Sequence, residues 1–372
     1  MSNYKVELER TEKQDLEIKK HISDVKGIVK SKVNKDVNGL NSIKSLIENE
    51  TLGGYIVDDF IKIKNLEVVE FVPNDGNYIF TWQFTGNTSF VWSVAVDKDG
   101  NVYSGSQANK VMKISPDGQK LWEFTVHTSG VNSVAVDNEG NVYSCSGDRS
   151  VMKISSIGEK IWRFAGYPNT VYSVAVDSDG NVYSGSSDNK VMKISPDGQK
   201  LWEFTVHTSG VNSVAVDNNG NIYSGSYDKK AMKISPDGQK LWEFTGHTNA
   251  VRSVAVDNKG NVYTGSADRK VMKISSSGEK IWEFTGHADA VNSVAVDKDG
   301  NVYSGSKDKK AMKISPDGQK LWEFTVHTDA VNSVAVDNNC NVYTGSSDDR
   351  VMKNELKREP LGYKVLTVER GQ

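Results

Sequence analysis

A period of forty residues is the sequence feature that most limits how this chain can fold. The aspartate of the stretch V-D-x-x-G-N recurs seven times, at Asp97, Asp137, Asp177, Asp217, Asp257, Asp297 and Asp337. The tryptophan of the stretch K-L-W-E-F or T-W-Q-F recurs with the same spacing, at Trp82, Trp122, Trp162, Trp202, Trp242, Trp282 and Trp322. Self-similarity at a fixed period indicates a repeat architecture and takes precedence over any local signal.

Each unit contains four segments with the composition of short β-strands: V-N-S-V-A-V-D, N-V-Y-S-G-S, V-M-K-I-S and K-L-W-E-F-T. Val, Ile, Tyr, Trp and Phe favour strands, while D-x-x-G-N and S-P-D-G-Q supply turn residues. The glycine of the first turn is expected to adopt a positive φ in a hairpin loop. The predicted fold is therefore mainly β, a seven-bladed β-propeller of forty-residue, four-stranded repeats, preceded by an N-terminal α-helical module.

The order of the segments predicts how the ring closes. Residues 78–84, Y-I-F-T-W-Q-F, have the pattern of a fourth strand but precede the first unit, whereas the seventh unit ends without a K-L-W-E-F segment. We therefore expect residues 78–84 to form the outer strand of the seventh blade, which leaves only short, protected edges. The predicted propeller spans residues 78–355.

Residues 246–271, G-H-T-N-A-V-R-S-V-A-V-D-N-K-G-N-V-Y-T-G-S-A-D-R-K-V, resemble a blade of the WD-repeat propellers. The shared features are the Gly-His pair, the Ser-Val-Ala-Val strand and the Gly-Ser-x-Asp turn, and the resemblance covers about residues 78–353. The chain departs from that family where Ile194-Ser195 and its equivalents stand in place of Trp-Asp. The run V-D-x-x-G-N-V-Y with K-I-S-P-D-G also resembles bacterial propellers of the NHL and quinoprotein types. The resemblance implies the fold more strongly than any function.

Five of the six histidines occupy one position of the repeat. In the WD-repeat family this histidine hydrogen-bonds the aspartate of the Ser-x-Asp turn. The resemblance therefore implies five structural braces, His127 with Asp148, His207 with Asp228, His247 with Asp268, His287 with Asp308, and His327 with Asp348. The first unit lacks both partners, having Asn87 and Ala108, and the third keeps Asp188 opposite Tyr167. A histidine repeated in this way is better explained as a buried polar brace than as five catalytic bases.

Neither a metal site nor a catalytic site is predicted. D-x-D-G occurs in three units and could suggest calcium, but other units replace its second aspartate, for example by Lys259, and no long ligand loop ends in a carboxylate. Cys145 and Cys340 have no metal-ligand spacing and are expected to be reduced thiols. The chain contains no G-x-S-x-G, H-E-x-x-H or G-x-x-x-x-G-K motif. We therefore expect no enzyme activity, no cofactor and no metal.

Differences between the units concentrate at two positions. The residue before the invariant serine of the first strand is Trp92, Asn132, Tyr172, Asn212, Arg252, Asn292 or Asn332. The residue after Gly-Ser, or its equivalent, is Gln107, Gly147, Ser187, Tyr227, Ala267, Lys307 or Ser347. In a four-stranded meander both positions emerge on one face of the disc, which we call the variable face.

Aromatic residues and arginine dominate the hot spots of protein interfaces. The variable face is therefore predicted to bind a ligand or partner, with the anchors Trp92, Tyr172, Tyr227, Arg252 and Lys307. The alternative is neutral drift at exposed loops after recent duplication, which does not readily explain why the substitutions include large aromatic side chains.

The first 54 residues follow the periodicity of an α-helix instead. An apolar stripe begins with Ile18, Ile22, Val25, Val29 and Val33 and continues to residue 47 with a mean spacing near 3.6 residues. Ten Lys or Arg against nine Asp or Glu make this a mixed-charge surface, not a basic membrane helix. We expect residues 1–54 to be an amphipathic attachment module, docking on a partner or self-associating as a coiled coil into a homo-oligomer. Residues 55–77 are predicted to be a short β connector, and 356–372 a C-terminal tail strand.

Charge and hydropathy limit the choice of partner. The formal net charge of −3 argues against a nucleic-acid partner, and no apolar segment approaches the length of a membrane span. The first residues lack the pattern of a signal peptide, so synthesis in the cytoplasm is expected.

The leading hypothesis is a non-enzymatic structural and recognition protein. Its propeller would be displayed on a larger assembly, such as a phage tail, baseplate or tail-like particle, with neighbouring protein subunits and a cell-surface protein or glycan as partners. The first alternative is an intracellular bacterial WD-repeat scaffold that joins protein partners. The second alternative, from a different class, is a propeller enzyme.

Overall fold

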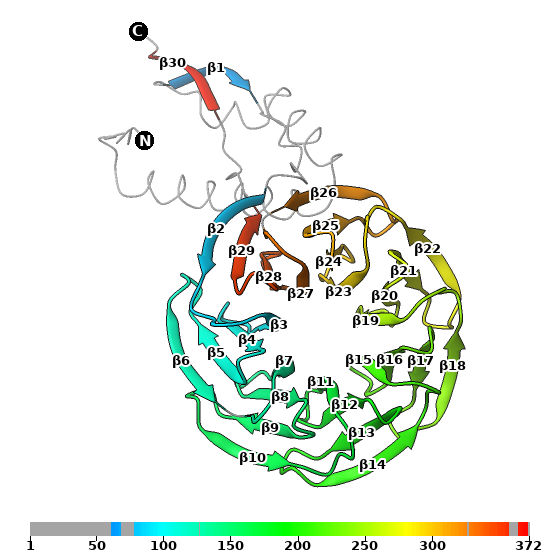
Figure 1. Ribbon diagram of the computed structural model, residues 1–372. Helices are drawn as coiled ribbons and strands as arrows, with labels where there is room; N and C mark the ends of the chain where they lie inside the picture. The colour runs from blue at the N-terminus through cyan, green and yellow to red at the C-terminus, as the bar shows by residue number, and fades with distance from the viewer. Residues whose placement is uncertain (1–60, 68–77, 126, 326, 357–363, 371–372) are drawn as a thin grey trace, which may run out of the picture. The chain divides into compact units, whose positions relative to one another are not determined.

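The computed structural model describes residues 61–67, 78–125, 127–325, 327–356 and 364–370. Within residues 73–358, seven four-stranded antiparallel sheets follow one another around a ring (Figure 1). The predicted mainly β, seven-bladed propeller is confirmed. The predicted helical module, residues 1–54 with Ile18, Ile22, Val25, Val29 and Val33, lies outside the described residues.

Six blades are each built from four consecutive strands, numbered from the inside of the ring outward. Blade 1 contains β3 (Val91–Val96), β4 (Val102–Ser106), β5 (Lys110–Ile114) and β6 (Lys120–Thr125). Blade 2 contains β7 (Val131–Val136), β8 (Val142–Ser146), β9 (Val151–Ile154) and β10 (Lys160–Phe164). Blade 3 contains β11 (Val171–Val176), β12 (Val182–Ser186), β13 (Lys190–Ile194) and β14 (Lys200–Thr205).

The next three blades repeat this order. Blade 4 contains β15 (Val211–Val216), β16 (Ile222–Ser226), β17 (Ala231–Ile234) and β18 (Lys240–Phe244). Blade 5 contains β19 (Val251–Val256), β20 (Val262–Ser266), β21 (Val271–Ile274) and β22 (Lys280–Phe284). Blade 6 contains β23 (Val291–Val296), β24 (Val302–Ser306), β25 (Lys310–Ile314) and β26 (Lys320–Thr325).

Blade 7 draws its strands from both ends of the ring. It contains β27 (Val331–Val336), β28 (Val342–Ser346), β29 (Val351–Leu356) and β2 (Tyr78–Phe84). Strand β2 pairs antiparallel with β29, from Tyr78 opposite Leu356 to Phe84 opposite Val351, and Figure 1 shows the two strands side by side. The ring is therefore closed by hydrogen bonds between its first and last strands.

The second strand of each blade is buried along its whole length. In β4 all five residues of V-Y-S-G-S are buried, and the equivalent strands of the other blades have the same pattern. A Cβ atom added at Gly105 would lie 2.7 Å from Val131 Cγ1 of the next blade. Glycine at this position thus permits close packing between blades, and blade 2 has the fully buried Cys145 there.

The D-x-x-G-N turn has a chemical reason for its aspartate. Asp97 Oδ1 accepts hydrogen bonds from the backbone amides of Asp99 and Asn101, at 3.0 and 2.8 Å. Its Oδ2 accepts from Asn101 Nδ2 and from Tyr103 Oη, each at 2.9 Å. The tyrosine is fully buried, and Lys113 Nζ lies over its ring at 5.3 Å from the centroid. All seven units repeat this arrangement, so each aspartate joins its turn to the core of its blade.

Hydrogen bonds join neighbouring blades at the innermost strands. Ser93 Oγ of blade 1 accepts from the backbone amide of Val134 in blade 2 at 3.0 Å. The same bond occurs at all seven junctions, including Ser333 of blade 7 with Val94 of blade 1, at distances of 3.0–3.3 Å. This series is a continuous circle of hydrogen bonds around the inside of the propeller.

A second series joins the blades at the outer strands. The indole Nε1 donates to a backbone carbonyl in the outer turn of the next blade, at 2.8–3.2 Å, from Trp82, Trp122, Trp162, Trp202, Trp242 and Trp282. The repeated tryptophan therefore connects blades as well as filling space within one.

The five histidine–aspartate pairs implied by the resemblance are hydrogen-bonded. The Nδ1 atom of each histidine lies 2.9–3.0 Å from a carboxylate oxygen of its aspartate. The Nε2 atom lies 2.7–3.0 Å from a Ser or Thr hydroxyl on the second strand. All five histidines are buried, and a neutral ring that donates from Nδ1 and accepts at Nε2 satisfies both contacts. In blade 3, Tyr167 hydrogen-bonds the equivalent Ser184 hydroxyl instead.

The remaining described strands form a separate small sheet. Strand β1 (Ile61–Glu67) pairs antiparallel with β30 (Lys364–Arg370), with Ile61 opposite Arg370 and Glu67 opposite Lys364. These strands fall within the predicted β connector and the predicted tail strand. They belong to a compact unit distinct from the propeller.

The closing strand gives the first prediction. A chain that begins at Pro73 is expected to unfold cooperatively, because it keeps β2 and all seven blades. A chain that begins at Thr85 loses β2, which exposes the outer edge of β29, and we expect it to unfold at a lower urea concentration. Equal unfolding midpoints for the two chains would contradict the role of β2 in closing the ring.

The brace gives the second prediction. Replacing His247 or Asp268 by Ala should lower the free energy of unfolding by about 1–3 kcal/mol, because the remaining partner is left buried without its hydrogen bond. The matched control is Ala108→Ser in blade 1, which has no such pair and should change little. Urea unfolding curves measure both effects, and equal losses at the two sites would refute the pairing.

The third prediction concerns pH. Burial lowers the pKa of His127 and His207 below the ordinary value, against the opposing effect of Asp148 and Asp228. The unfolded chain therefore binds more protons below about pH 6.5, and stability should fall as the pH drops through that range. The double variant His127→Asn, His207→Asn should lose less stability between about pH 7 and 5, because asparagine does not bind a proton in this range. Asparagine suits the fold at this position, since blade 1 already carries Asn87 there. An unchanged slope would show that these histidines do not cause the pH dependence.

Candidate functional site

The two variable positions meet at one edge of each blade. The backbone amide of Gln107, at the start of the loop between the second and third strands, donates to the carbonyl of Phe90 just before the inner strand, at 2.8 Å. Equivalent bonds occur in the other six blades at 2.9–3.3 Å. The variable face thus consists, in each blade, of the loop before the inner strand, the second residue of that strand and the loop between strands two and three.

The second residue of the inner strand has a structural role in four blades. Asn132 Nδ2 donates to the carbonyl of Val171 in the next blade at 2.8 Å. Asn212, Asn292 and Asn332 make the equivalent bond to the next blade, each at 3.0 Å. Asparagine is therefore the residue that joins neighbouring blades at this edge of the propeller.

In the other three blades, large side chains replace this asparagine. They are Trp92, Tyr172 and Arg252, in blades 1, 3 and 5, and each is partly exposed. No equivalent bond to the next blade's valine carbonyl is made from these positions in the described part of the chain. Arg252 Nη1 instead donates to Asn292 Oδ1 at 2.6 Å, and Trp92 Nε1 donates to Gln107 Oε1 at 2.7 Å.

Three of the five predicted anchors lie together across blades 3, 4 and 5. The rings of Tyr172 and Tyr227 meet edge to face, with centroids 6.1 Å apart and an interplanar angle of 72°. Tyr227 is 50% exposed, one of the highest fractions among the aromatic residues that the structure describes. Burial of its inner part and the neighbouring Tyr172 raise the pKa of Tyr227, while the Arg252 guanidinium acts in the opposite direction. The three side chains therefore form one aromatic and cationic cluster.

The remaining anchors lie elsewhere on the variable face. Trp92 forms a second aromatic group in blade 1 with Phe90, whose ring meets it edge to face at 5.8 Å and is 44% exposed. Phe90 was not predicted as an anchor, although the other blades have Gly, Thr or Ala at that position. Lys307 is exposed on blade 6, and the structure shows no contact between it and the other four anchors.

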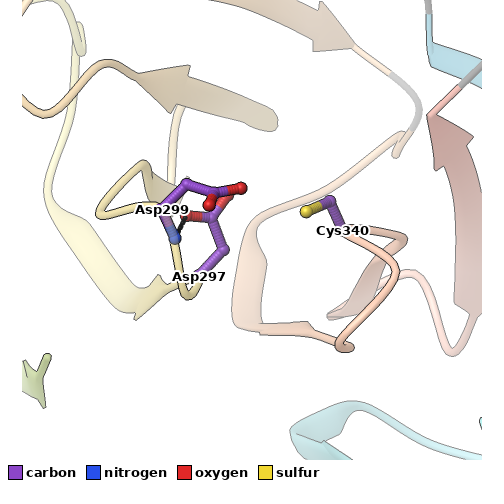
Figure 2. A group of neighbouring side chains, drawn as sticks. All are labelled: Asp297, Asp299 and Cys340. Carbon is purple, nitrogen blue, oxygen red and sulfur yellow. Dashed lines mark hydrogen bonds between the residues drawn. The ribbon is translucent and has the colours of Figure 1, made fainter. Parts of the chain in front are cut away.

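One group of side chains has the composition of a metal site. Figure 2 shows Asp297, Asp299 and Cys340, whose possible ligand atoms lie within 4.8 Å of one another. Both oxygens of Asp297 are already engaged, Oδ1 by the amides of Asp299 and Asn301, and Oδ2 by Asn301 Nδ2 and Tyr303 Oη. Burial and the two carboxylates raise the pKa of the Cys340 thiol, which favours its neutral form over a ligating thiolate. We assign no metal to this group.

Cys340 is a departure from the repeat. It stands where the other six units have a glycine with φ near +80°, and its own φ is 63°. The same carboxylate contacts occur in the D-x-D-G turns at Asp97 and Asp177, where each Oδ1 accepts bonds from backbone amides of its own turn.

The described residues include no helix long and apolar enough to cross a membrane.

Comparisons with known proteins place the chain among propellers. The family model described as outer membrane protein assembly factor BamB matches residues 65–222 and 155–285, which together are more than half of the chain. The WD domain, G-beta repeat model matches residues 278–315 and 318–353. No curated protein matches the chain significantly.

A solved structure supports the same fold. The WD40 β-propeller domain of Doa1, known from a crystal structure, superposes with a TM-score of 0.70 at 22% sequence identity. The match covers 76% of this chain and 98% of the Doa1 domain, and at this identity it bears on the fold alone. From the matched residues and the seven blades, the chain belongs to the PQQ-like propeller family and carries WD repeats in its last blades.

Proposed function

We propose that this chain is a non-catalytic scaffold that binds protein partners through its variable face. The WD repeats in residues 278–353 and the likeness to a WD40 propeller domain support this function. This function corresponds to the WD-repeat scaffold, the first alternative that the sequence suggested. Nothing in the comparisons favours a phage tail, baseplate or tail-like particle component, so that more specific prediction is not carried forward.

The observation that carries the proposal is the loss of asparagine in blades 1, 3 and 5. An intramolecular hydrogen bond contributes about 0.5–1.5 kcal/mol to stability. Trp92 and Tyr172 forgo such a bond to the next blade, while Arg252 exchanges it for one to the Asn292 side chain. All three place a large, partly exposed side chain on the variable face. Residues that reduce stability in this way are typical of functional surfaces. Neutral drift would not favour an aromatic or arginine side chain at all three positions.

The inner strands support a binding role over an enzymatic one. Their V-x-S-V-A-V pattern is nearly the same in all seven blades, whereas a propeller enzyme requires a distinct set of central ligands. The side chains that differ are those expected of a protein interface, where tryptophan, tyrosine and arginine contribute most to affinity.

The proposal predicts opposite effects on stability and on binding. In the triple variant Trp92→Asn, Tyr172→Asn, Arg252→Asn, the first two substitutions should each gain a bond to the next blade, and the third exchanges one such bond for another. The variant should therefore unfold at a higher urea concentration, with the free energy of unfolding raised by about 0.5–1.5 kcal/mol for each of the two aromatic substitutions. It should also lose partners that the wild-type chain retains on an affinity column, because the hot-spot side chains are gone. Quantitative mass spectrometry of the two eluates measures the loss.

The matched control is Asn132→Ala. This variant removes the bond from Asn132 to the Val171 carbonyl, so it should be less stable than the wild type by about 0.5–1.5 kcal/mol yet retain the same partners. If the triple variant retains every partner, or if the control loses them equally, the working surface has been assigned wrongly.

A further inference from the structure

We infer that the partner of the variable face is an acidic peptide segment that docks over blades 4, 5 and 6. This inference rests on the proposed scaffold function and specifies the chemistry of its partner. It is carried by the distribution of charge on the variable face and by the position of the tyrosine pair, Tyr172 and Tyr227.

Five cations gather on the variable face of three consecutive blades. This basic arc consists of Lys229, Arg252, Arg269, Lys307 and Lys309. Lys229, Arg269, Lys307 and Lys309 are exposed at the loops between the second and third strands, and Figure 1 shows their blades, β15–β18, β19–β22 and β23–β26, side by side in the ring. In the described part of the chain, none of the five is within ion-pair distance of a carboxylate.

Neighbouring lysines show that the arc is not simply part of a charge-balanced surface. Lys230, Lys270 and Lys310 directly follow three members of the arc, and each pairs with a glutamate on the outer strand at 2.5–3.0 Å. Each of those glutamates has a lowered pKa because two lysines hydrogen-bond it. The larger effect comes from Lys230 on Glu243 and from Lys310 on Glu323, whereas on Glu283 it comes from Lys280, ahead of Lys270. The structure therefore neutralises the lysines that face the outer strand and leaves the charges of the arc without a carboxylate partner, although Arg252 also donates to the Asn292 side chain.

The rest of the variable face does not continue the positive charge. The loops between the second and third strands carry Gln107 and Asn109 in blade 1, and Ser187 and Asn189 in blade 3, while Arg149 stands alone in blade 2. Blade 7 has the opposite sign, with Asp329 and Asp349. A ligand with carboxylates is thus attracted to one side of the disc and repelled from the next blade, which would fix its position as well as its affinity.

The tyrosine pair adds an apolar contact at one end of the arc. Tyr227 directly precedes the Asp228–Lys229 pair of blade 4, and its half-exposed ring lies against Tyr172 and within electrostatic reach of Arg252. A peptide that combines carboxylates with an aromatic or branched apolar side chain would use both features.

A nucleic acid fits this surface less well. A duplex needs basic side chains that follow its phosphates, and a single strand needs in addition open aromatic faces on which its bases can stack. Here Asp289 of blade 6 interrupts the arc, Asp329 and Asp349 border it, and the two tyrosine rings meet edge to face. The formal charge of the whole chain, −3, adds no long-range attraction for phosphates.

The test is a selection of short random peptides on the immobilised full chain, followed by affinity measurement of the selected peptides by fluorescence anisotropy. Enrichment of Asp and Glu beside an aromatic residue is expected, with weaker binding at high salt. The variant Lys229→Asn, Arg269→Asn, Lys309→Asn should bind the selected peptides about tenfold more weakly. Asn109 and Asn189 occupy the same left-handed positions in blades 1 and 3, so these substitutions suit the fold.

The matched control removes the same number of cations from the opposite loops. Lys98→Asn, Lys259→Asn, Lys298→Asn alters exposed D-x-x-G-N turns in which other blades carry asparagine, such as Asn138 and Asn219. This control should bind the peptides with unchanged affinity. Because it loses as many positive charges as the arc variant, it distinguishes an effect of the basic arc from an effect of the net charge of the protein.

Three outcomes would overturn the inference. Selected peptides without acidic residues, or without sensitivity to the arc variant, would leave the scaffold function intact but refute the acidic partner. Failure to select any peptide would refute a linear segment as the ligand. The scaffold function would still be supported in that case if the wild type captured partners that the Trp92, Tyr172, Arg252 triple variant did not capture. Tighter binding of a labelled oligothymidine than of the peptides, lost in the arc variant, would make the arc a nucleic-acid surface.

Discussion

A circle of hydrogen bonds, each donated by a valine amide to a serine hydroxyl of the preceding blade, is the constraint on which the rest of the propeller depends. Each blade is a small sheet that cannot bury both of its faces alone, so its stability depends on the two neighbours that cover them. The bond that the Val134 amide donates to Ser93 Oγ, and its six equivalents, join each inner strand to the next at the same position of the repeat. Because the same residues make the same bond at every junction, the rotation is uniform, and seven units return to the starting point. The glycines of the second strands then allow the packed faces to meet.

Uniform junctions also explain where the sequence can vary. Residues that take part in the repeated contacts, such as Asp97, Tyr103 and Trp122, have equivalents in nearly every blade. The amino-acid sequence can vary at the exposed edge of each blade, in the loop before the inner strand and the loop after the second strand. The three blades without asparagine at the inner position keep the serine and tryptophan bonds to the next blade. Because several hydrogen bonds join each pair of neighbouring blades, the propeller can lose the asparagine bond at some junctions and carry a different side chain on the variable face there.

Much of this architecture could be predicted from the chain alone. The forty-residue period gave the number of blades, and the displaced Y-I-F-T-W-Q-F segment indicated the strand that closes the ring, because both are properties of order along the sequence. The role of Asn132 could not be predicted, since its partner Val171 lies in another blade and only the rotation between blades brings the two together. The cluster of Tyr172, Tyr227 and Arg252 was likewise visible only as separate substitutions. Phe90 was not predicted, because it lies in the loop before the inner strand and not at either of the two positions of the repeat where the units differ most.

The antiparallel pairing of β2 with β29 has a mechanical consequence. Tyr78 begins β2 and Leu356 ends β29, and the two residues are direct partners, so the polypeptide enters and leaves the propeller at a single point. A pulling force applied to the two flanking segments would act on this strand pair in unzipping geometry. It would break the hydrogen bonds of the pair one after another, whereas a shear geometry would load them all at once. The ring would then resist force weakly at its seam and strongly everywhere else. Force transmitted through the flanks would open blade 7 while leaving blades 4 to 6 in place.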